Sequence, residues 1–306
     1  RMLPPVVESH EITGRLTADV AEQLGLSAGT PVVGGGGDQP AGAVGNGVVV
    51  EGLTSATMGT SGVVYVHSSG YRTDPQSRVG TFCSCVQDEY CLFGCILSAG
   101  GSFQWFRNTL GQAEVKQAKK QRCDPYELLT AQAAAAPAGC EGVFWLPYLT
   151  GERTPHGDPY ARACWIGMHS RTTRNELVRS VMEGATFGMN DAVTLLRELG
   201  LSIRQIRLSG GGARSEFWRQ LQADIYNATC VTINAEEGPA YGVALLAAAG
   251  TGRFKNVREA CKAGISITRT IKPDAKSRKL YAQYYKQYRR LYPALKQEFA
   301  LLAGLP

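Results

Sequence analysis

At 306 residues the chain is long enough for one large domain or two ordinary ones, each with a buried core. Hydrophobic residues make up 44% of it and charged residues 19%, which is ordinary globular usage and excludes an intrinsically disordered chain. No apolar run approaches the ~20 residues that cross a bilayer, so we expect a soluble protein without a membrane partner.

The net charge of +6 comes from 32 basic and 26 acidic residues, with much of the excess in the last fifty residues. Tyrosines and leucines at helical spacing, from Tyr281 to Tyr292, are interleaved with these basic residues. A solvated helix is therefore favoured over a nucleic-acid site. Nine cysteines without a recognisable secretory signal predict free thiols and a cytoplasmic protein.

Short elements and glycine turns alternate in the first fifty residues. Pro4 and Pro5 are typical of a linker, so we interpret the start of the chain as lying inside a larger domain. The predicted elements are a helix at 16–24, a buried strand at 31–33, a glycine run at 34–37 and, after Asp38, a tightly packed helix at 41–47.

Strands dominate the next fifty residues and helices follow them. Strands are predicted at 55–58, 63–67, 81–86 and 90–97, and helices at 101–110 and 126–136. The clearest helix spans 174–199, because Thr173 and Glu176 have capping-box spacing at its start and Gly200 follows its end. Beyond it we predict a strand at 203–208, a helix from Ser215, a strand at 230–233 and a helix at 239–249. Alternating strands and helices indicate an α/β fold.

Familiar catalytic and phosphate-binding motifs are missing. The sequence has no G-x-x-x-x-G-K-[ST], G-x-G-x-x-G, H-E-x-x-H or G-x-S-x-G pattern. Three glycine turns remain, at 34–37, 59–62 and 210–212, each at the end of a predicted strand. They are either ordinary turns that need positive φ or backbone cradles for an anion, and spacing alone does not decide between these readings.

Asp38 likewise has two interpretations. Followed by Pro40 near a first helical turn, it is a good helix N-cap. A carboxylate there is also suited to act as a general base, accepting the proton of an alcohol during phosphoryl transfer.

Clustered cysteines and isolated histidines give no convincing metal site. Cys83, Cys85, Cys91 and Cys95 have the alternation of a β-hairpin turning at 88–89, which predicts small apolar core residues instead of zinc ligands. His67, His156 and His169 have no partner at ligand spacing, so surface or core roles are favoured. No metal-ligating residue is assigned.

Four segments occur in an order that resembles the FGGY family of carbohydrate kinases, and within it the xylulokinase branch. They are PVVGGGGDQPAGAVGNG at 31–47, TMGTSG at 57–62, YLTGERTPHGDP at 148–159 and LSGGGARSEFWRQLQADI at 208–225. The stretch ACWIGMHSRTTRNELVRSVME at 163–183 also resembles a signature of that family. Four ordered motifs over nearly the whole chain are more specific than any one of them.

The resemblance implies an actin-like ATPase fold with RNase H-like domains. Residues 1–50 would form the C-terminal end of the first, sugar-binding domain, and 51–306 the second, nucleotide-binding domain with its C-terminal helix. The residues that it assigns are Asp38 as catalytic base, Gly59 and Thr60 at the transferring phosphate, Gly100 and Gln104 at a nucleotide-contacting helix, and Gly211, Gly212, Ala213 and Ser215 at the adenosine.

The implied reaction is transfer of the γ-phosphoryl group of Mg-ATP to a sugar hydroxyl, D-xylulose giving D-xylulose 5-phosphate in xylose metabolism. Alternatives are a kinase of L-ribulose or glycerol, a non-catalytic actin-like nucleotide-binding module, and a structural protein without a nucleotide site. The resemblance also suggests a homodimer. Gln39 and Pro40 stand where many xylulokinases have Asn-Ala. This difference concerns which sugar is bound more than how the phosphoryl group is transferred. The D-x-G-T phosphate and magnesium loop has no counterpart here, so we expect this chain alone to be inactive.

Overall fold

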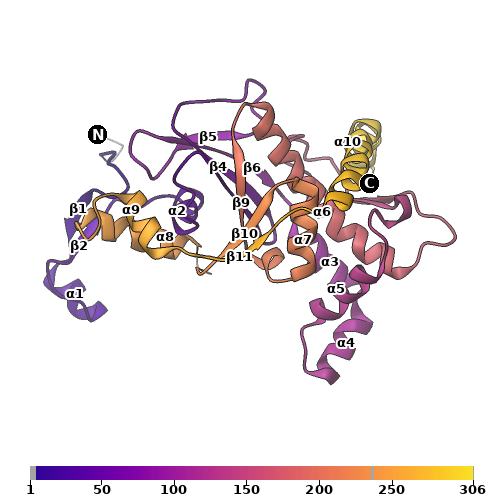
Figure 1. Cartoon of the computed structure of the whole chain (residues 1–306), viewed down its shortest axis with the longest axis horizontal. Coiled ribbons are helices and arrows are strands. Elements are labelled where there is room, and N and C mark those ends of the chain that lie inside the picture. Colours follow the sequence, from indigo (N-terminus) through magenta and orange to yellow (C-terminus); the bar gives the residue numbers. More distant parts are fainter. Residues whose placement is uncertain (1–4, 236–237, 306) are drawn as a thin grey trace.

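The computed structural model describes residues 5–235 and 238–305, and it is built around a seven-stranded mixed sheet (Figure 1). Its strands lie in the order β11-β10-β9-β3-β4-β6-β5. They are β3 (Gly52–Met58), β4 (Gly62–Ser68), β5 (Gly80–Cys83), β6 (Tyr90–Ile96), β9 (Ile203–Ser209), β10 (Thr229–Ile233) and β11 (Ile267–Ile271). Strands β3, β9 and β10 are parallel and the remaining pairs are antiparallel.

Ten helices and two small sheets surround it in the described part of the chain. The helices are α1 (Ala18–Leu24), α2 (Asp38–Gly45), α3 (Gly100–Thr109), α4 (Gln112–Gln121), α5 (Pro125–Ala135), α6 (Arg174–Glu198), α7 (Glu216–Tyr226), α8 (Gly238–Gly250), α9 (Val257–Gly264) and α10 (Ala275–Ala303). The small sheets pair β1 (Ile12–Arg15) with β2 (Pro31–Val33), and β7 (Phe144–Leu146) with β8 (Cys164–Ile166). The predicted α/β class is confirmed.

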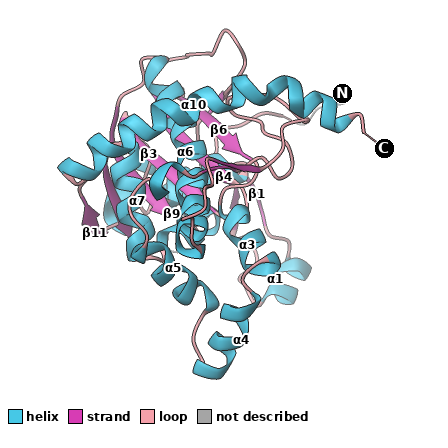
Figure 2. Ribbon diagram, turned by 90° about the vertical axis from the view of Figure 1, so that its right-hand side faces the viewer, coloured by secondary structure: helices cyan, strands magenta, loops and turns pink. Residues whose placement is uncertain are grey.

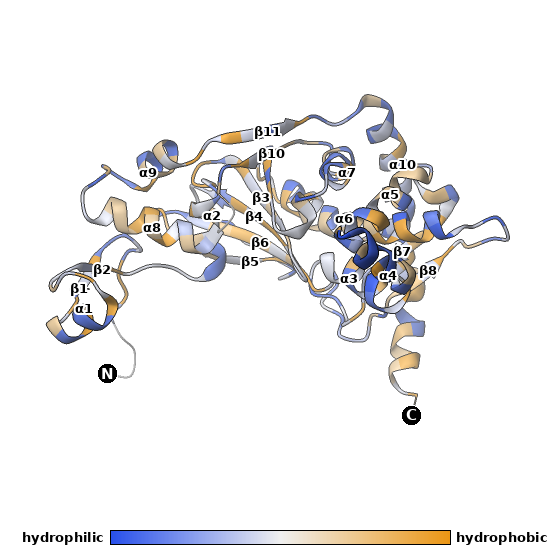
Figure 3. Cartoon of the chain, turned by 90° about the horizontal axis from the view of Figure 1, so that it is seen from below, coloured by the Kyte–Doolittle hydropathy of each residue, from blue (hydrophilic) through white to orange (hydrophobic). Residues whose placement is uncertain are grey.

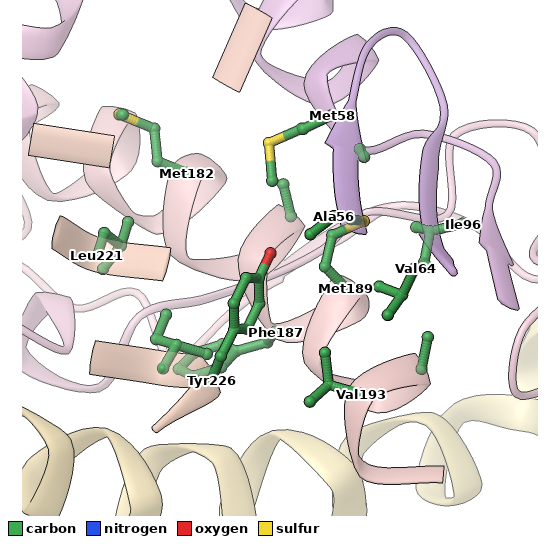
Figure 4. Close-up of a cluster of buried hydrophobic side chains, with 14 of the residues drawn as sticks. Ala56, Met58, Val64, Ile96, Met182, Phe187, Met189, Val193, Leu221 and Tyr226 are labelled. Atoms are coloured by element: carbon green, nitrogen blue, oxygen red, sulfur yellow. The ribbon is translucent and has the colours of Figure 1, made fainter. Parts of the chain in front are cut away.

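Both faces of the central sheet are covered, because successive side chains of a strand point to opposite faces. On β4, Val64 and Val66 pack into the main core, whereas Val63 and Tyr65 pack with Ala43 of α2. The main core lies between the sheet and α6, where Met189 and Val193 approach Val64 and Ile96 (Figure 4). Helix α2 therefore lies on the face opposite α6, and the apolar strands run between the two layers (Figure 3).

Helix α6 is the buried axis of the main core, and its predicted boundaries are confirmed to within a residue. Thr173 caps its start, with Glu176 completing the capping box. Its middle is buried all round, since α3, α5 and α7 pack on it from several sides. Helix α10 crosses the outside of this layer (Figure 2) and buries Tyr281, Tyr288 and Tyr292, which confirms the predicted packing stripe.

Helices α2 and α8 touch backbone to backbone. A Cβ added to Gly45 would lie 1.8 Å from the carbonyl oxygen of Gly238, and one added to Gly242 would lie 1.8 Å from that of Ala41. Real Cβ atoms do not approach other atoms so closely, so glycine is required at both positions. The small residues predicted to pack tightly after Asp38 serve this contact.

A matched pair of substitutions on α2 tests the contact. Gly45→Ala should lower the free energy of unfolding by about 1–3 kcal/mol, because the methyl group must separate the two helices. Gly42→Ala should be neutral or stabilising by up to ~1 kcal/mol, because its nearest foreign atom is Cγ of Pro239 at 3.5 Å and alanine favours a helix. Urea unfolding of both variants measures the difference, and equal midpoints would contradict the contact.

Several elements differ from the sequence prediction. The hairpin of β5 and β6 is present, but β5 ends at Cys83 and is the edge strand, so Cys83 is exposed and its predicted core role is wrong. Cys85 and Cys91 are buried as expected, and Cys95 is half-buried. The unpredicted elements are α4, α9, β1, β7, β8 and β11. Among the described helices, none is both long and apolar enough to cross a membrane.

The three histidines considered above as possible ligands each have a structural partner. His67 is buried against the carboxylate of Glu89. The ring of His156 stacks on Tyr292 with 3.5 Å between ring centroids, and burial lowers the pKa of His156 to about 4. The Nε2 atom of His169 lies 3.6 Å from a carboxylate oxygen of Glu141.

Candidate active site

A cavity of about 710 Å³ opens where β3 ends and α3 and α7 begin; we call it the main cavity. Four segments that are distant in the sequence form its walls: the β3–β4 turn, the start of α3, the start of α5, and the glycine turn that leads into α7. The residues lining it are Met58, Gly59, Thr60, Gly100, Phe103, Gln104, Asp124, Tyr126, Glu127, Thr130, Gly211, Gly212, Arg214, Ser215, Glu216, Phe217 and Trp218.

The β3–β4 turn and the start of α3 lie in direct backbone contact. Gly101 donates its N–H to the carbonyl oxygen of Thr60 at 2.9 Å. A Cβ on Gly100 would lie 2.4 Å from the carbonyl oxygen of Gly59. Only a glycine at position 100 allows this approach, so the predicted residues Gly59, Thr60 and Gly100 are brought together by the fold itself.

The glycine turn after β9 packs on the end of β3. Gly210 has φ of +77°, which favours glycine, and a Cβ there would lie 2.6 Å from the carbonyl oxygen of Met58. A Cβ on Gly212 would meet the Met58 sulfur at 2.6 Å. Gly211 and Gly212 line the cavity, whereas Ala213 lies in the same turn without lining it.

The start of α7 is fixed by its cap and by an aromatic contact. Ser215 is the N-cap, and its hydroxyl accepts the N–H of Trp218 at 3.2 Å. Trp218 donates its indole N–H to the hydroxyl of Thr186 at 2.9 Å and meets Phe103 edge to face. These contacts hold an aromatic wall beside backbone amides, an arrangement that suits a flat ring carrying phosphates.

The fourth wall, from α5, was not predicted as part of a site. Asp124 caps α5 by accepting the N–H of Tyr126 at 2.9 Å, and the guanidinium of Arg107 lies 4.8 Å from the Tyr126 ring centroid. Glu127 and Thr130 complete this wall. The Asp-Pro dipeptide at 124–125 signals the helix start, but nothing in the sequence indicates that this helix faces a cavity.

Asp38 is not part of the main cavity. It is the first residue of α2, its side chain is exposed, and its carboxylate accepts hydrogen bonds from the backbone N–H and the side-chain amide of Gln39. The N-cap position belongs to Gly37, so the N-cap interpretation of Asp38 is wrong. The glycine run before it is tightly placed, since a Cβ on Gly36 would lie 2.5 Å from the sulfur of Cys85.

The described residues fit a nucleotide better than a metal ion. Glycine turns and an aromatic wall enclose the main cavity, which is the arrangement that accepts phosphates and a base. No three His, Cys, Asp or Glu side chains within 5–235 and 238–305 are grouped to hold a metal ion.

Glu152 braces the segment that leads into α3. Its Oε1 atom accepts the N–H groups of Leu97 at 2.9 Å and Arg153 at 2.8 Å, while Oε2 is buried without a partner among the described residues. Burial, and to a smaller extent the nearby carboxyl of Asp191, raise the pKa of Glu152 to about 8. At neutral pH the side chain therefore retains its proton.

This protonation makes stability depend on pH. The folded state keeps the proton up to about pH 8, whereas the unfolded chain loses it near the usual value of 4.5. Between these values the unfolded state binds fewer protons, so the free energy of unfolding should fall by up to about 1.4 kcal/mol per pH unit. Glu152→Gln removes this loss, so its stability relative to wild type should increase from pH 5.5 to 7.5 in urea titrations. Glu298→Gln, which changes an exposed carboxylate, is the control. If the free energy of unfolding varied with pH in the same way for wild type and both variants, Glu152 would not be the group responsible.

Comparisons with known proteins show the family of this chain. The model of the FGGY family of carbohydrate kinases, C-terminal domain, matches residues 54–251, and that of the N-terminal domain matches residues 1–45. A xylulose kinase of Staphylococcus epidermidis is 37% identical over 294 residues, which cover 96% of this chain and 57% of that protein. A xylulose kinase of Bacillus subtilis is 36% identical over 289 residues, covering 94% of this chain and 56% of that protein.

A solved structure has the same fold as this chain. The crystal structure of a "xyloylose kinase" from Brucella ovis superimposes with a TM-score of 0.85 at 31% identity, covering 96% of this chain and 58% of that one. The actin-like ATPase fold predicted from the sequence is confirmed. The chain spans somewhat more than half the length of these relatives, and it belongs to the FGGY family of carbohydrate kinases.

Proposed function

We propose that the polypeptide containing this chain phosphorylates a sugar hydroxyl with ATP, and that the sugar is D-xylulose. One observation carries the nucleotide part of this proposal: glycine segments predicted separately as phosphate and adenosine contacts converge on the main cavity. The choice of sugar is supported by the relatives of this chain, which are xylulose kinases.

The walls of the main cavity suggest which part of ATP each would hold. Gly59 and Thr60, in the β3–β4 turn, are assigned to the phosphates. Gly100 and Gln104 line the same side and are assigned beside them. Gly211, Gly212 and Ser215 are assigned to the adenosine next to the aromatic wall of Phe103 and Trp218, with Ala213 supporting their turn. Magnesium is expected to be held by the phosphates and by residues outside this chain.

Asp38 is proposed as the general base. Its carboxylate is exposed and bonded only to Gln39 among the described residues, so a substrate hydroxyl has access to it. Taking the hydroxyl proton as the oxygen attacks the γ-phosphorus would orient the nucleophile and raise its reactivity. Because Asp38 lies outside the main cavity, the reaction requires the sugar to bridge α2 and the phosphates.

We also propose a domain organisation, an oligomeric state and a location for the protein. Residues 1–50 are assigned to the end of the sugar-binding domain and 51–306 to the nucleotide-binding domain, in a cytoplasmic homodimer acting in xylose metabolism. A kinase of L-ribulose or glycerol would keep the cavity and change only the sugar. A non-catalytic nucleotide-binding module would keep ADP binding without any transfer.

A coupled ADP-release assay on the natural polypeptide that contains this chain separates these functions. Release that depends on D-xylulose, at rates well above those with L-ribulose, glycerol or no sugar, is the expected result. Release with another polyol would move the substrate and keep the mechanism. ADP binding without release on any sugar would overturn the kinase proposal in favour of the binding module.

A further inference from the structure

A second cavity, of about 360 Å³, lies between α7 and the edge strand β11; we call it the edge cavity. Three cationic side chains line it: Arg219 from α7, Arg269 from β11, and Lys272 directly after β11. None of the three lines the main cavity. Glu216 is the only carboxylate among the residues lining the edge cavity, and it lines the main cavity as well.

Arg219 is a largely buried cation without an ion pair among the described residues. Only 8% of the surface of this residue is exposed. Its Nε atom is buried and has no hydrogen-bond partner among the described residues. Within 5–235 and 238–305 no carboxylate oxygen forms an ion pair with it. The buried Arg179 shows the usual arrangement, because its Nε lies 2.7 Å from a carboxylate oxygen of Glu183.

A partly buried guanidinium that forms no direct ion pair lowers the stability of the folded state. Burial, and then the charge of Arg269, lower the pKa of Arg219, while the charge of Glu216 raises it by less, so the second cation adds to this cost. An anion in the edge cavity would offset both effects. Arginine is suited to this role because its planar fork binds two oxygens of one phosphate group.

We propose that the edge cavity is a binding site for a phosphate group, carried either by inorganic phosphate or by a phosphorylated sugar. Arg219 supplies its Nε and Nη2 groups, since its Nη1 is bound to backbone carbonyl oxygens, and Arg269 and Lys272 supply exposed positive charges beside the anion. The three cations outnumber the single carboxylate of Glu216, which leaves the cavity net positive.

The edge cavity is connected to the main cavity through Arg219. Its Nη1 donates to the carbonyl oxygens of Ala213 at 2.7 Å and Arg214 at 2.9 Å, in the turn that lines the main cavity. An anion that orders Arg219 would also order this turn, so phosphate and nucleotide are expected to change each other's affinity by the same factor. The existence of the second site does not depend on the kinase activity proposed above.

The test is a titration of this chain with inorganic phosphate and, separately, with D-xylulose 5-phosphate, followed by thermal unfolding at constant ionic strength with chloride as balance. Excess ADP fills the main cavity in one series and is absent in the other. A saturable rise in melting temperature that persists with ADP is expected. Arg269→Ala and Lys272→Ala should each weaken the apparent affinity about five- to tenfold, as the loss of one charge-assisted contact.

Lys279→Ala, an exposed cation on α10 outside the cavity, is the matched control and should leave the response unchanged. The stronger of the two ligands identifies the source of the phosphate group. An equal response in Arg269→Ala, Lys272→Ala and wild type would overturn the proposal, as would a response abolished by ADP. A separate ADP titration reports on the main cavity, so failure of the proposed kinase function is distinguished from failure of this site.

Discussion

Asp38→Asn should lower the kcat of sugar-dependent ADP release by two to four orders of magnitude, the range that a positioned general base contributes. Asparagine has the same shape and can still accept the N–H of Gln39, so α2 should be unchanged, but its amide cannot take the hydroxyl proton. ADP affinity should stay within about twofold of wild type, because Asp38 does not line the main cavity. The coupled assay and a direct ADP titration measure the two quantities.

The matched control is Asp19→Asn, an exposed carboxylate in the first turn of α1, within the same N-terminal segment. It should retain the wild-type rate. A kcat for Asp38→Asn within a few-fold of wild type would remove the general-base role, and a parallel loss of ADP affinity would mean that the substitution acts on the fold instead of on the chemistry.

Gly100→Ala should weaken ADP binding by about tenfold or more. The added Cβ would lie 2.4 Å from the carbonyl oxygen of Gly59, so the start of α3 has to move away from the β3–β4 turn. Overpacking of this kind costs about 1–3 kcal/mol, which corresponds to one or two decades if the bound nucleotide requires the original spacing. Titration with a fluorescent ADP analogue measures the affinity.

Gly70→Ala is the control for this substitution. A Cβ there meets nothing within 4 Å, so neither affinity nor stability should change appreciably. If Gly100→Ala binds ADP as wild type does while remaining folded by circular dichroism, then the contact between α3 and the turn does not shape the nucleotide site.

Glycine patterns predicted the walls of the main cavity better than any charged residue did. The turns at 59–62 and 210–212 follow strands that run parallel in one sheet, β3 and β9, so their ends meet at one edge. Gly210 needs positive φ, and Gly100 and Gly212 need close backbone or side-chain approach, so these glycines are signals that a single sequence carries. The same argument accounts for the small residues of α2.

Other features depend on tertiary contacts that leave no local signal. Asp124 and Tyr126 line the main cavity at the start of α5, but the sequence of that helix does not show which of its sides faces a cavity. Strand β11 is an exposed edge strand without apolar alternation, and β7 and β8 have three residues each, so periodicity does not reveal them. Asp38 illustrates a local ambiguity: its N-cap pattern was convincing, yet Gly37 holds that position.

The most direct test of the central claim is a crystal structure of this chain grown with ADP. We expect the phosphates beside Gly59 and Thr60, and the adenosine against the turn of Gly211 and Gly212 next to Trp218. ADP bound elsewhere, or a main cavity that stays without nucleotide at saturating ADP, would contradict the assignment of this cavity as the nucleotide site.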